Sequence, residues 1–400
     1  MAIQDQGVPT LLIIPLIQIF IVLLLFFALL KGQRDLAILA LLVLGFTGGI
    51  WLWTRASLTG LTCEFHLDKT KLFPGEIFNL IIRADNRKSL PLWLQIIVPV
   101  SSLLNPAAGK KMLLKEGALL WYQRANFTWE LTAERRGVYR IGPARILAGD
   151  LFAFFTKNKK SEAVQDILVY PRLVPIRTFA LPRGDFFGIP GAQSPVPDPL
   201  YILGTRDYQP GRPAKYIHWK ASARRDRLQE KVLEPTLQEK VLLVVDTSQF
   251  SRYNAEEEFE RTLEKIASLA ALLDRRGHAL GLVTNGLVEG NNVARVPVAR
   301  NHQQLPAILE ILARLQMKPR LRLNDAVRSG LTTGWGLSGV CFFYKKDRTL
   351  GLMDAYFKRL KIPILFFVCQ PRTNAVESRP GTGGNIYELD SMDVKERADT

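Results

Sequence analysis

The sequence LLIIPLIQIFIVLLLFFALL, residues 11–30, decides the class of this protein. It has no charged side chain, and Gln18 is its only strongly polar residue. About 20 apolar residues in a helix are enough to cross the roughly 30 Å hydrocarbon core of a bilayer. The stretch therefore predicts a membrane-spanning helix.

A second charge-free run follows the first at residues 36–54. Trp51 and Trp53 lie near its end, where aromatic side chains favour the membrane interface. The linker between the two runs, residues 31–35, is too short to form a domain. We therefore expect residues 1–57 to form a transmembrane helical hairpin, with its spans at about 8–30 and 36–53.

Two other interpretations of this segment are a signal peptide and a buried core helix. A signal peptide needs a basic start, and Met1–Gln6 has neither Lys nor Arg. A soluble core helix of this length normally has a polar face. Gly45 and Gly49 form a GxxxG pattern, which permits close helix packing but is weak support for a dimer.

Composition excludes several classes of protein. Apolar residues make up 48% of the chain and charged residues 22%, so a packed core is expected. Only three cysteines occur, widely spaced, which excludes a disulfide-stapled secreted fold and fits a reducing compartment.

The net charge of the chain is +16, and it bears on the orientation in the membrane. Basic residues near the predicted spans are almost balanced between the two sides. The charge and the free thiols then favour the cytoplasmic face of a cell membrane for the large domains, where anionic lipid attracts basic segments.

After the hairpin the pattern changes to period two. Phe127, Trp129 and Leu131 alternate with polar residues, and similar short runs recur between turn signals. About seven such strands are typical of an antiparallel β-sandwich, expected here over residues 58–180.

The second half of the chain alternates strands and helices. A linker and signature segment is expected over 181–235, an α/β domain with a mainly parallel sheet over 236–372, and a flexible, glycine- and charge-rich tail over 373–400. Residues 241–245, VLLVV, form a continuous apolar run, as expected for a strand buried on both faces.

The segment from Gly204 to Arg227 is the most distinctive in the chain. Basic residues concentrate between Arg212 and Arg227, with aromatic residues interleaved. Four short motifs stand in it: Arg206-Asp207-Tyr208, Pro210-Gly211, Ile217-His218-Trp219-Lys220 and Ser222-Ala223-Arg224. Two further pieces lie upstream, RGVYRIGP at residues 136–143 and DLFAFF at residues 150–155.

In combination these motifs resemble the bacterial domain-of-unknown-function family 58, membrane-anchored companions of MoxR-type AAA+ ATPases. The residues predicted to form the signature or partner-binding site are Arg206, Asp207, Tyr208, Arg212, His218, Trp219, Lys220, Ser222 and Arg224. Arg212 departs from the family, which usually has Asp after the Pro-Gly turn; if that Asp pairs with a basic residue or a ligand in relatives, the role is lost or altered here.

The resemblance also implies a von Willebrand factor A-like α/β domain. Such domains often hold Mg²⁺ or Mn²⁺ through an Asp-x-Ser-x-Ser motif after the first strand. Asp246 and Ser248 match that motif, but Phe250 replaces its last Ser. Thr284 could supply a further ligand. No Asp closely follows the later strand at residues 340–344, since Asp347, the nearest, lies behind Lys345 and Lys346. The site is incomplete, so no cofactor is expected.

His218 and Ser222 are the only pair that invites a catalytic interpretation. A Ser–His pair without an orienting carboxylate and an oxyanion hole is weak support for a hydrolase. Phosphate-loop, dinucleotide and HExxH zinc motifs do not occur. The basic cluster could contact a partner protein or anionic lipid headgroups, or simply face solvent, and nucleic acid is the least expected ligand.

These observations favour a non-enzymatic, membrane-anchored interaction protein. The resemblance makes a MoxR-type AAA+ ATPase the expected partner, in the assembly or maturation of other proteins. A divalent-cation-dependent ligand-binding or adhesion module is the first alternative, and a hydrolase is the second.

Overall fold

The structure is a computed structural model. It describes residues 10–104, 111–151, 156–177, 197–211, 213–235, 240–290, 294–331, 337–369 and 385–394. The chain divides into two compact units, Met1–Tyr170 and Pro171–Thr400.

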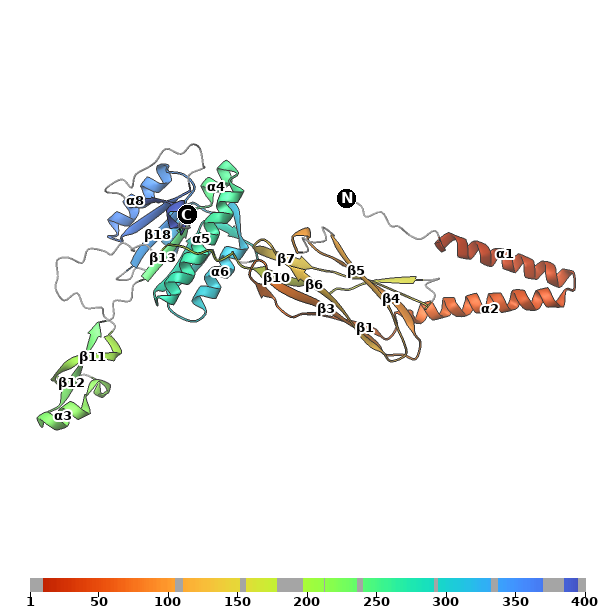
Figure 1. The fold of residues 1–400 in the computed structure, drawn as a ribbon, viewed down its shortest axis with the longest axis horizontal. Helices are drawn as coiled ribbons and strands as arrows, with labels where there is room; N and C mark the ends of the chain where they lie inside the picture. Colours follow the sequence, from red (N-terminus) through yellow and green to blue (C-terminus); the bar gives the residue numbers. More distant parts are fainter. Residues whose placement is uncertain are drawn as a thin grey trace, which may run out of the picture. The chain divides into compact units, whose positions relative to one another are not determined.

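The first unit begins with two helices, α1 (Thr10–Leu30) and α2 (Arg34–Ser57), which pack against each other (Figure 1). Among the described residues, α2 is the one helix long and apolar enough to cross a membrane. Only 17% of its most apolar window is buried within the protein, unlike the core helix of a soluble domain. Leu16–Leu30 of α1 is a shorter apolar helical segment. Large apolar side chains of both helices, such as Phe20 and Leu42, are exposed.

Ten short strands follow among the described residues, and we call this part the β-region. They are β1 (Leu61–Leu67), β2 (Lys71–Leu72), β3 (Ile77–Asn86), β4 (Leu92–Pro99), β5 (Met112–Leu119), β6 (Arg124–Thr132), β7 (Gly137–Ile141), β8 (Arg145–Gly149), β9 (Thr156–Lys160) and β10 (Gln165–Val169). A 3₁₀ turn, η1 (Ser102–Leu104), follows β4. The sheets have the strand orders β1-β3-β6, β2-β10-β7 and β5-β4-β8-β9. All of their pairs are antiparallel except β10 with β2.

Period-two patterning explains these strands. In β3, Phe78, Leu80, Ile82 and Ala84 are fully buried, and the residues between them face outward or are half-buried. Alternate residues of a strand point to opposite faces, so one face of β3 enters the core. The structure confirms the antiparallel strands that the sequence predicts here.

The second unit contains an antiparallel pair that flanks a short helix. The elements are β11 (Pro197–Asp207), η2 (Ala214–Tyr216), α3 (Trp219–Arg225) and β12 (Gln229–Pro235). We call residues 197–235 the signature module. Arg212 and residues 178–196 of the predicted linker lie outside the described residues.

The rest of the second unit is a mixed sheet with helices. Its six strands have the order β16-β14-β13-β18-β19-β20, and only the β14–β16 pair is antiparallel. The strands are β13 (Lys240–Val245), β14 (Ala279–Thr284), β16 (Arg295–Ala299), β18 (Leu337–Phe343), β19 (Ile364–Val368) and β20 (Ile386–Glu388). A separate pair joins β15 (Gly286–Val288) to β17 (Leu315–Pro319).

The helices of this part are α4 (Ser248–Tyr253), α5 (Glu256–Arg275), α6 (Gln304–Arg314), α7 (Leu323–Gly330) and α8 (Arg348–Arg359). Val327 of α7 and Phe357 of α8 share one apolar core with Leu242 and Val244 of β13. The alternate residues Val241 and Leu243 are also fully buried, so both faces of this strand are covered.

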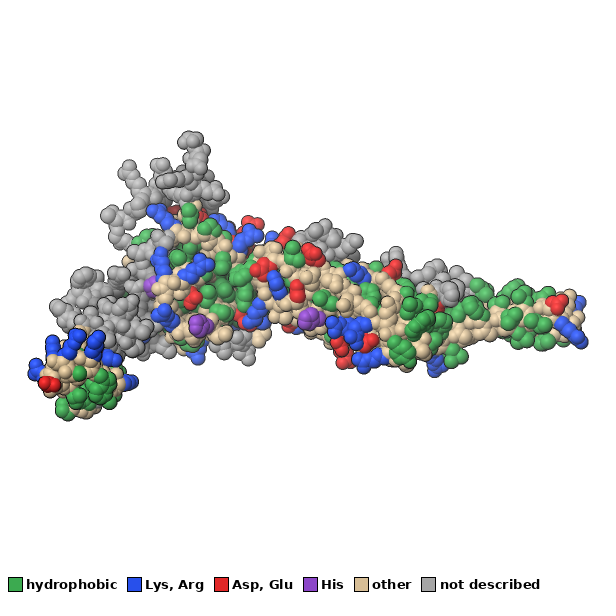
Figure 2. All heavy atoms as spheres, turned by 60° about the horizontal axis from the view of Figure 1, so that its bottom comes forward, with side chains coloured by type: hydrophobic (Ala, Val, Ile, Leu, Met, Phe, Trp, Pro, Cys, Tyr) green, Lys and Arg blue, Asp and Glu red, His purple; other side chains and the backbone are tan. Residues whose placement is uncertain are grey.

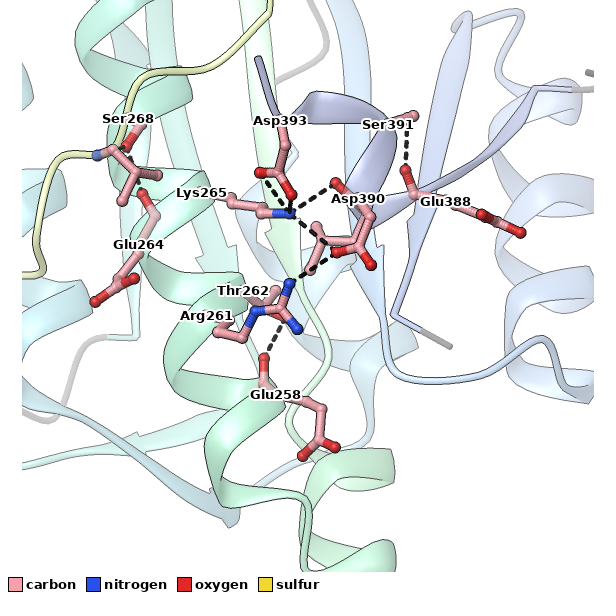
Figure 3. Close-up of polar contacts among 12 residues, drawn as sticks. Glu258, Arg261, Thr262, Glu264, Lys265, Ser268, Glu388, Asp390, Ser391 and Asp393 are labelled. Atoms are coloured by element: carbon pink, nitrogen blue, oxygen red, sulfur yellow. Dashed lines mark hydrogen bonds and ion pairs between the residues drawn. The ribbon is translucent and has the colours of Figure 1, made fainter. Parts of the chain in front are cut away.

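The end of the chain differs from the predicted flexible tail over 373–400. Residues 385–394 form β20 and the turn η3 (Leu389–Met392), while 370–384 and 395–400 lie outside the described residues. The buried ammonium of Lys265 on α5 holds this turn. Its Nζ lies 2.9 Å from Asp393 Oδ1 and 3.2 Å from Asp390 Oδ1, and it donates to the Leu389 carbonyl (Figure 3). Charge pairing and the burial of Leu389 therefore order a segment whose composition indicates flexibility.

Candidate functional site

The first candidate site lies at the carboxyl edge of the mixed sheet. Asp246 follows β13, Asn285 follows β14 and Asp347 follows β18. Parallel strands end at the same edge, which is where α/β proteins usually bind ligands. Asp246 and Asn285 are each 1% exposed. The fold therefore buries a carboxylate and an amide side by side.

The orientation of the Asn285 amide follows from its neighbours. The backbone N–H of Thr247, which can only donate, lies 2.8 Å from Oδ1 of Asn285, so that atom must be the acceptor oxygen. The amide nitrogen Nδ2 then donates to Asp246 Oδ1 at 2.8 Å and to Ser248 Oγ at 2.7 Å. An N–H group thus takes up the two oxygens predicted to bind a cation.

The other candidate ligands are also engaged. Thr284 Oγ1 accepts from the Gly286 backbone at 3.2 Å, and Asp347 Oδ1 accepts from Thr349 and Leu350 at the start of α8. Phe250, at the position of the missing Ser, is fully buried in the core.

The donor set therefore does not fit a divalent cation. Asp246 Oδ2 is buried without a hydrogen-bond partner among the described residues, and a single oxygen falls short of the six or more that Mg²⁺ or Ca²⁺ takes. No group of three or more His, Cys, Asp or Glu that could hold a metal is found in the described ranges. Burial raises the pKa of Asp246, and the nearby charge of Asp347 adds to this effect. The sheet edge is a self-contained hydrogen-bonded network.

The second candidate site is the signature module, whose strands pair Arg206 with Glu230. Arg206 donates to Glu230 Oε1 from Nε at 3.0 Å and from Nη2 at 2.6 Å. The Glu230 side chain is 1% exposed, whereas that of Arg206 is 47% exposed. The pair therefore consists of a buried carboxylate and a guanidinium that reaches the surface of the module.

Gln229 organises the rest of the module. It is fully buried, and its Nε2 donates to Asp207 Oδ1 at 2.5 Å. Its Oε1 accepts from Arg225, and its backbone N–H donates to Ser222 Oγ at 2.8 Å. Its carbonyl accepts from the His218 backbone at 2.8 Å. The sequence did not predict roles for Gln229 and Glu230. Both are polar and lie next to a charged loop, and only their pairing with β11 explains why they are buried.

His218 and Ser222 have structural contacts. The Nδ1 atom of His218 accepts from the Ala221 backbone at 3.1 Å, which makes His218 the N-cap of α3. Ser222 Oγ donates to the His218 carbonyl at 3.1 Å and accepts from Gln229. Among the described residues no hydrogen bond joins the His218 ring to the Ser222 hydroxyl, so the Ser–His geometry of a hydrolase is not formed.

The remaining signature residues point outward or act through the backbone. Trp219 is 67% exposed, and Lys220 and Arg224 are exposed on the same short helix. Tyr208 donates its backbone N–H to the Leu228 carbonyl at 2.9 Å. Figure 2 shows basic side chains beside a hydrophobic area on the module. The module thus has an aromatic and cationic surface, and the hydrogen bonds of His218, Ser222 and Gln229 lie beneath it.

The cysteines offer no reactive thiol. Burial raises the pKa of Cys63 to about 11, and burial also raises the pKa of Cys341 and Cys369. Because the thiolate is the nucleophile, these groups stay protonated near neutral pH.

Fold and site together define a two-unit protein. An apolar helical start precedes antiparallel sheets, and the second unit contains a mixed α/β sheet and a basic module.

Residues 204–329 match the family described as "Protein of unknown function DUF58". The chain is also 26% identical over 255 residues to an uncharacterized protein, YeaD, of Bacillus subtilis (strain 168). That match covers 62% of this chain and 60% of the relative. Over residues 204–329 the chain is therefore similar to the DUF58 family.

Similarity to solved structures is weak. The CARDB domain of the PF1109 protein from Pyrococcus furiosus shares 14% identity, covering 27% of this chain and 91% of that chain, with a TM-score of 0.21. Proximal thread matrix protein 1 from the mussel byssus shares 9%, covering 33% and 37%, with a TM-score of 0.26. Neither likeness supports a statement about fold or function.

Proposed function

We propose that this protein is a membrane-anchored, non-enzymatic interaction protein that binds another protein through the signature module. The observation that carries the proposal is the display of Trp219, Lys220 and Arg224 on α3 above a buried polar frame. Exposed Trp and Arg side chains are enriched among the residues that dominate protein interfaces. A cationic surround favours a partner with an acidic surface.

In this proposal α1 and α2 form a two-span hairpin. The β-region is a sandwich, and the mixed sheet is a von Willebrand factor A-like domain. The exposed apolar side chains of both helices and the net charge of +16 support a membrane location with the large domains on the cytoplasmic side. The family resemblance makes a MoxR-type AAA+ ATPase the partner of choice, in assembling or maturing other proteins.

The test is capture of a purified MoxR-type ATPase from the same organism by the full chain in detergent. Charge reversal at Lys220→Glu and Arg224→Glu should lower the captured amount at least tenfold. Reversal at two exposed residues outside the module, Arg252→Glu and Arg359→Glu, is the matched control and should leave capture unchanged. Equal capture by both double variants, with unchanged circular dichroism, would exclude the module as the interface.

A further inference from the structure

The end of α2 is hydrogen-bonded directly to the β-region. The indole Nε1 of Trp53 donates to the Pro91 carbonyl at 2.6 Å. One residue further along, the buried hydroxyl of Thr54 donates to Asp150 Oδ2 at 3.2 Å. The helix therefore enters this body without an intervening free linker.

Lys88 completes the junction. Its Nζ donates to the carbonyls of Ala56 at 2.6 Å and Thr59 at 2.9 Å, and also to that of Ser57. The last carbonyls of a helix lack intrahelical donors, and a cation is favourable at that end. The β3–β4 loop, residues 87–91, is thus held against the last turn of α2.

The same loop holds a second turn, residues 120–123 between β5 and β6. The amide Nδ2 of Asn86 donates to the Leu90 carbonyl at 3.0 Å and to the Leu120 carbonyl at 2.8 Å. The Tyr122 backbone donates to the Lys88 carbonyl at 3.0 Å. Turn 120–123 and the end of α2 are therefore both hydrogen-bonded to the same residue of this loop, Lys88.

This turn exposes large apolar side chains. Trp121 is 62% exposed, Tyr122 is 71%, Leu120 is 46%, and Leu90 of the neighbouring loop is 36%. We call these four residues the interfacial patch. Figure 2 shows hydrophobic side chains gathered where α2 meets the β-region. Tyr122 also has a φ of 52°, a left-handed conformation in which Gly or Asn would be unstrained. Keeping an exposed Tyr there costs stability, which points to a role outside the folded core.

The length of α2 matches the thickness of a membrane. From Asp35 to Trp53 the helix advances about 27 Å at about 1.5 Å per residue, close to the thickness of a hydrocarbon core. Trp53 contacts the loop that bears Leu90, so the loop lies at the level where the helix leaves the bilayer. Exposed Arg55, whose guanidinium stacks over Trp51, provides a cation for the headgroups at this level. Arg87 is also exposed, although its guanidinium pairs with Asp85.

We infer that the interfacial patch inserts into the headgroup–acyl boundary of the bilayer that α2 crosses. Trp and Tyr favour this region because an apolar ring and a polar group are satisfied together there. The rigid junction with α2 and the patch then hold the β-region at two points, which sets its orientation on the membrane. This inference rests on the membrane anchor of the proposed function.

The test is quenching of tryptophan fluorescence by lipid. The full chain is reconstituted in phosphatidylcholine nanodiscs with or without bromine on the acyl chains, and the quenched fraction of the emission is measured. The chain has seven tryptophans. Trp121→Phe should lower the quenched fraction, because it removes a tryptophan that the lipid quenches. Trp219→Phe, at an equally exposed position in the other unit, should raise it, because an unquenched emitter is lost.

Trp51→Phe reports on the anchor itself and should lower the quenched fraction. If Trp51→Phe lowers it while Trp121→Phe raises it as Trp219→Phe does, the patch faces water or a protein and the inference is overturned with the anchor intact. If neither Trp51→Phe nor Trp121→Phe lowers the quenched fraction, α2 does not anchor the chain in the bilayer, and the proposed function is wrong as well.

Discussion

The amide nitrogen of Asn285 lies 2.8 Å from Oδ1 of Asp246, and this contact decides what the sheet edge can bind. An amide N–H occupies the side of the carboxylate that a cation would need. We expect the melting temperature of the protein to be unchanged by millimolar Mg²⁺ or Mn²⁺.

Replacing that donor should create a cation site. Asn285→Asp brings a second carboxylate to Asp246 and Ser248, so the variant should be less stable than the wild type in chelator. Added Mn²⁺ should restore its melting temperature, by about 2–4 °C for each kcal/mol of binding. Asn285→Ala is the control and should not respond. A Mn²⁺-dependent rise in the wild type would contradict our interpretation of the site.

The raised pKa of Asp246 predicts a pH effect of definite sign. The folded protein binds this proton more tightly than the unfolded chain, whose pKa is near the ordinary 3.8. The contribution of Asp246 to the free energy of unfolding therefore increases as the pH falls from the raised folded pKa toward 3.8. Asp246→Asn lacks this titration but keeps an acceptor oxygen for Asn285. Urea unfolding of both proteins between pH 4 and 7 should show that the free energy of unfolding of the wild type rises relative to that of the variant as the pH falls. A difference between the two free energies that does not change with pH would exclude a raised pKa of Asp246.

The Arg206–Glu230 pair should be the main electrostatic contribution to the signature module. Arg206→Met leaves a buried carboxylate without its cation, and because Arg206 is half exposed we expect a loss of about 1–3 kcal/mol. Arg206→Met combined with Glu230→Met should recover most of that loss. Arg227→Met removes a pair in which both side chains are more than 60% exposed, and should cost less than about 0.5 kcal/mol. Hydrogen exchange of the β11 and β12 amides measures all three; equal protection in Arg206→Met and Arg227→Met would show that the pair is dispensable.

Lys265 should control the order of residues 385–394. Lys265→Met removes the donor to Leu389, Asp390 and Asp393, and we expect faster exchange throughout β20 and a loss of about 1–3 kcal/mol. Arg261→Met is the matched control, because it removes a half-exposed partner of Asp390 and should cost at most about 1 kcal/mol. Unchanged exchange in Lys265→Met would mean that apolar burial of Leu389 and Met392 is sufficient.

Local patterns predicted the elements well where a residue's environment is set by its neighbours in the chain. The alternation in β3 and the apolar run of β13 follow from which face, or how many faces, a strand buries. The signature residues, in contrast, have roles that depend on residues elsewhere. His218 caps a helix whose position requires Gln229, ten or more residues along, and no spacing rule relates the two.

The order of the chain end shows the same limit. The composition after Arg372 predicts flexibility, whereas the structure holds the turn that follows β20 through Lys265, more than a hundred residues earlier in the chain.

By itself the sequence determined an apolar helical start, alternating strands, an α/β half and a basic segment, because hydrophobic periodicity and charge act over a few residues. Only the tertiary structure decided that Asn285 faces Asp246, that Glu230 is buried under Arg206, and that turn 120–123 lies beside the end of α2. Those relationships depend on which strands and loops become neighbours, and the hydrogen bonds that follow form only after distant segments have packed.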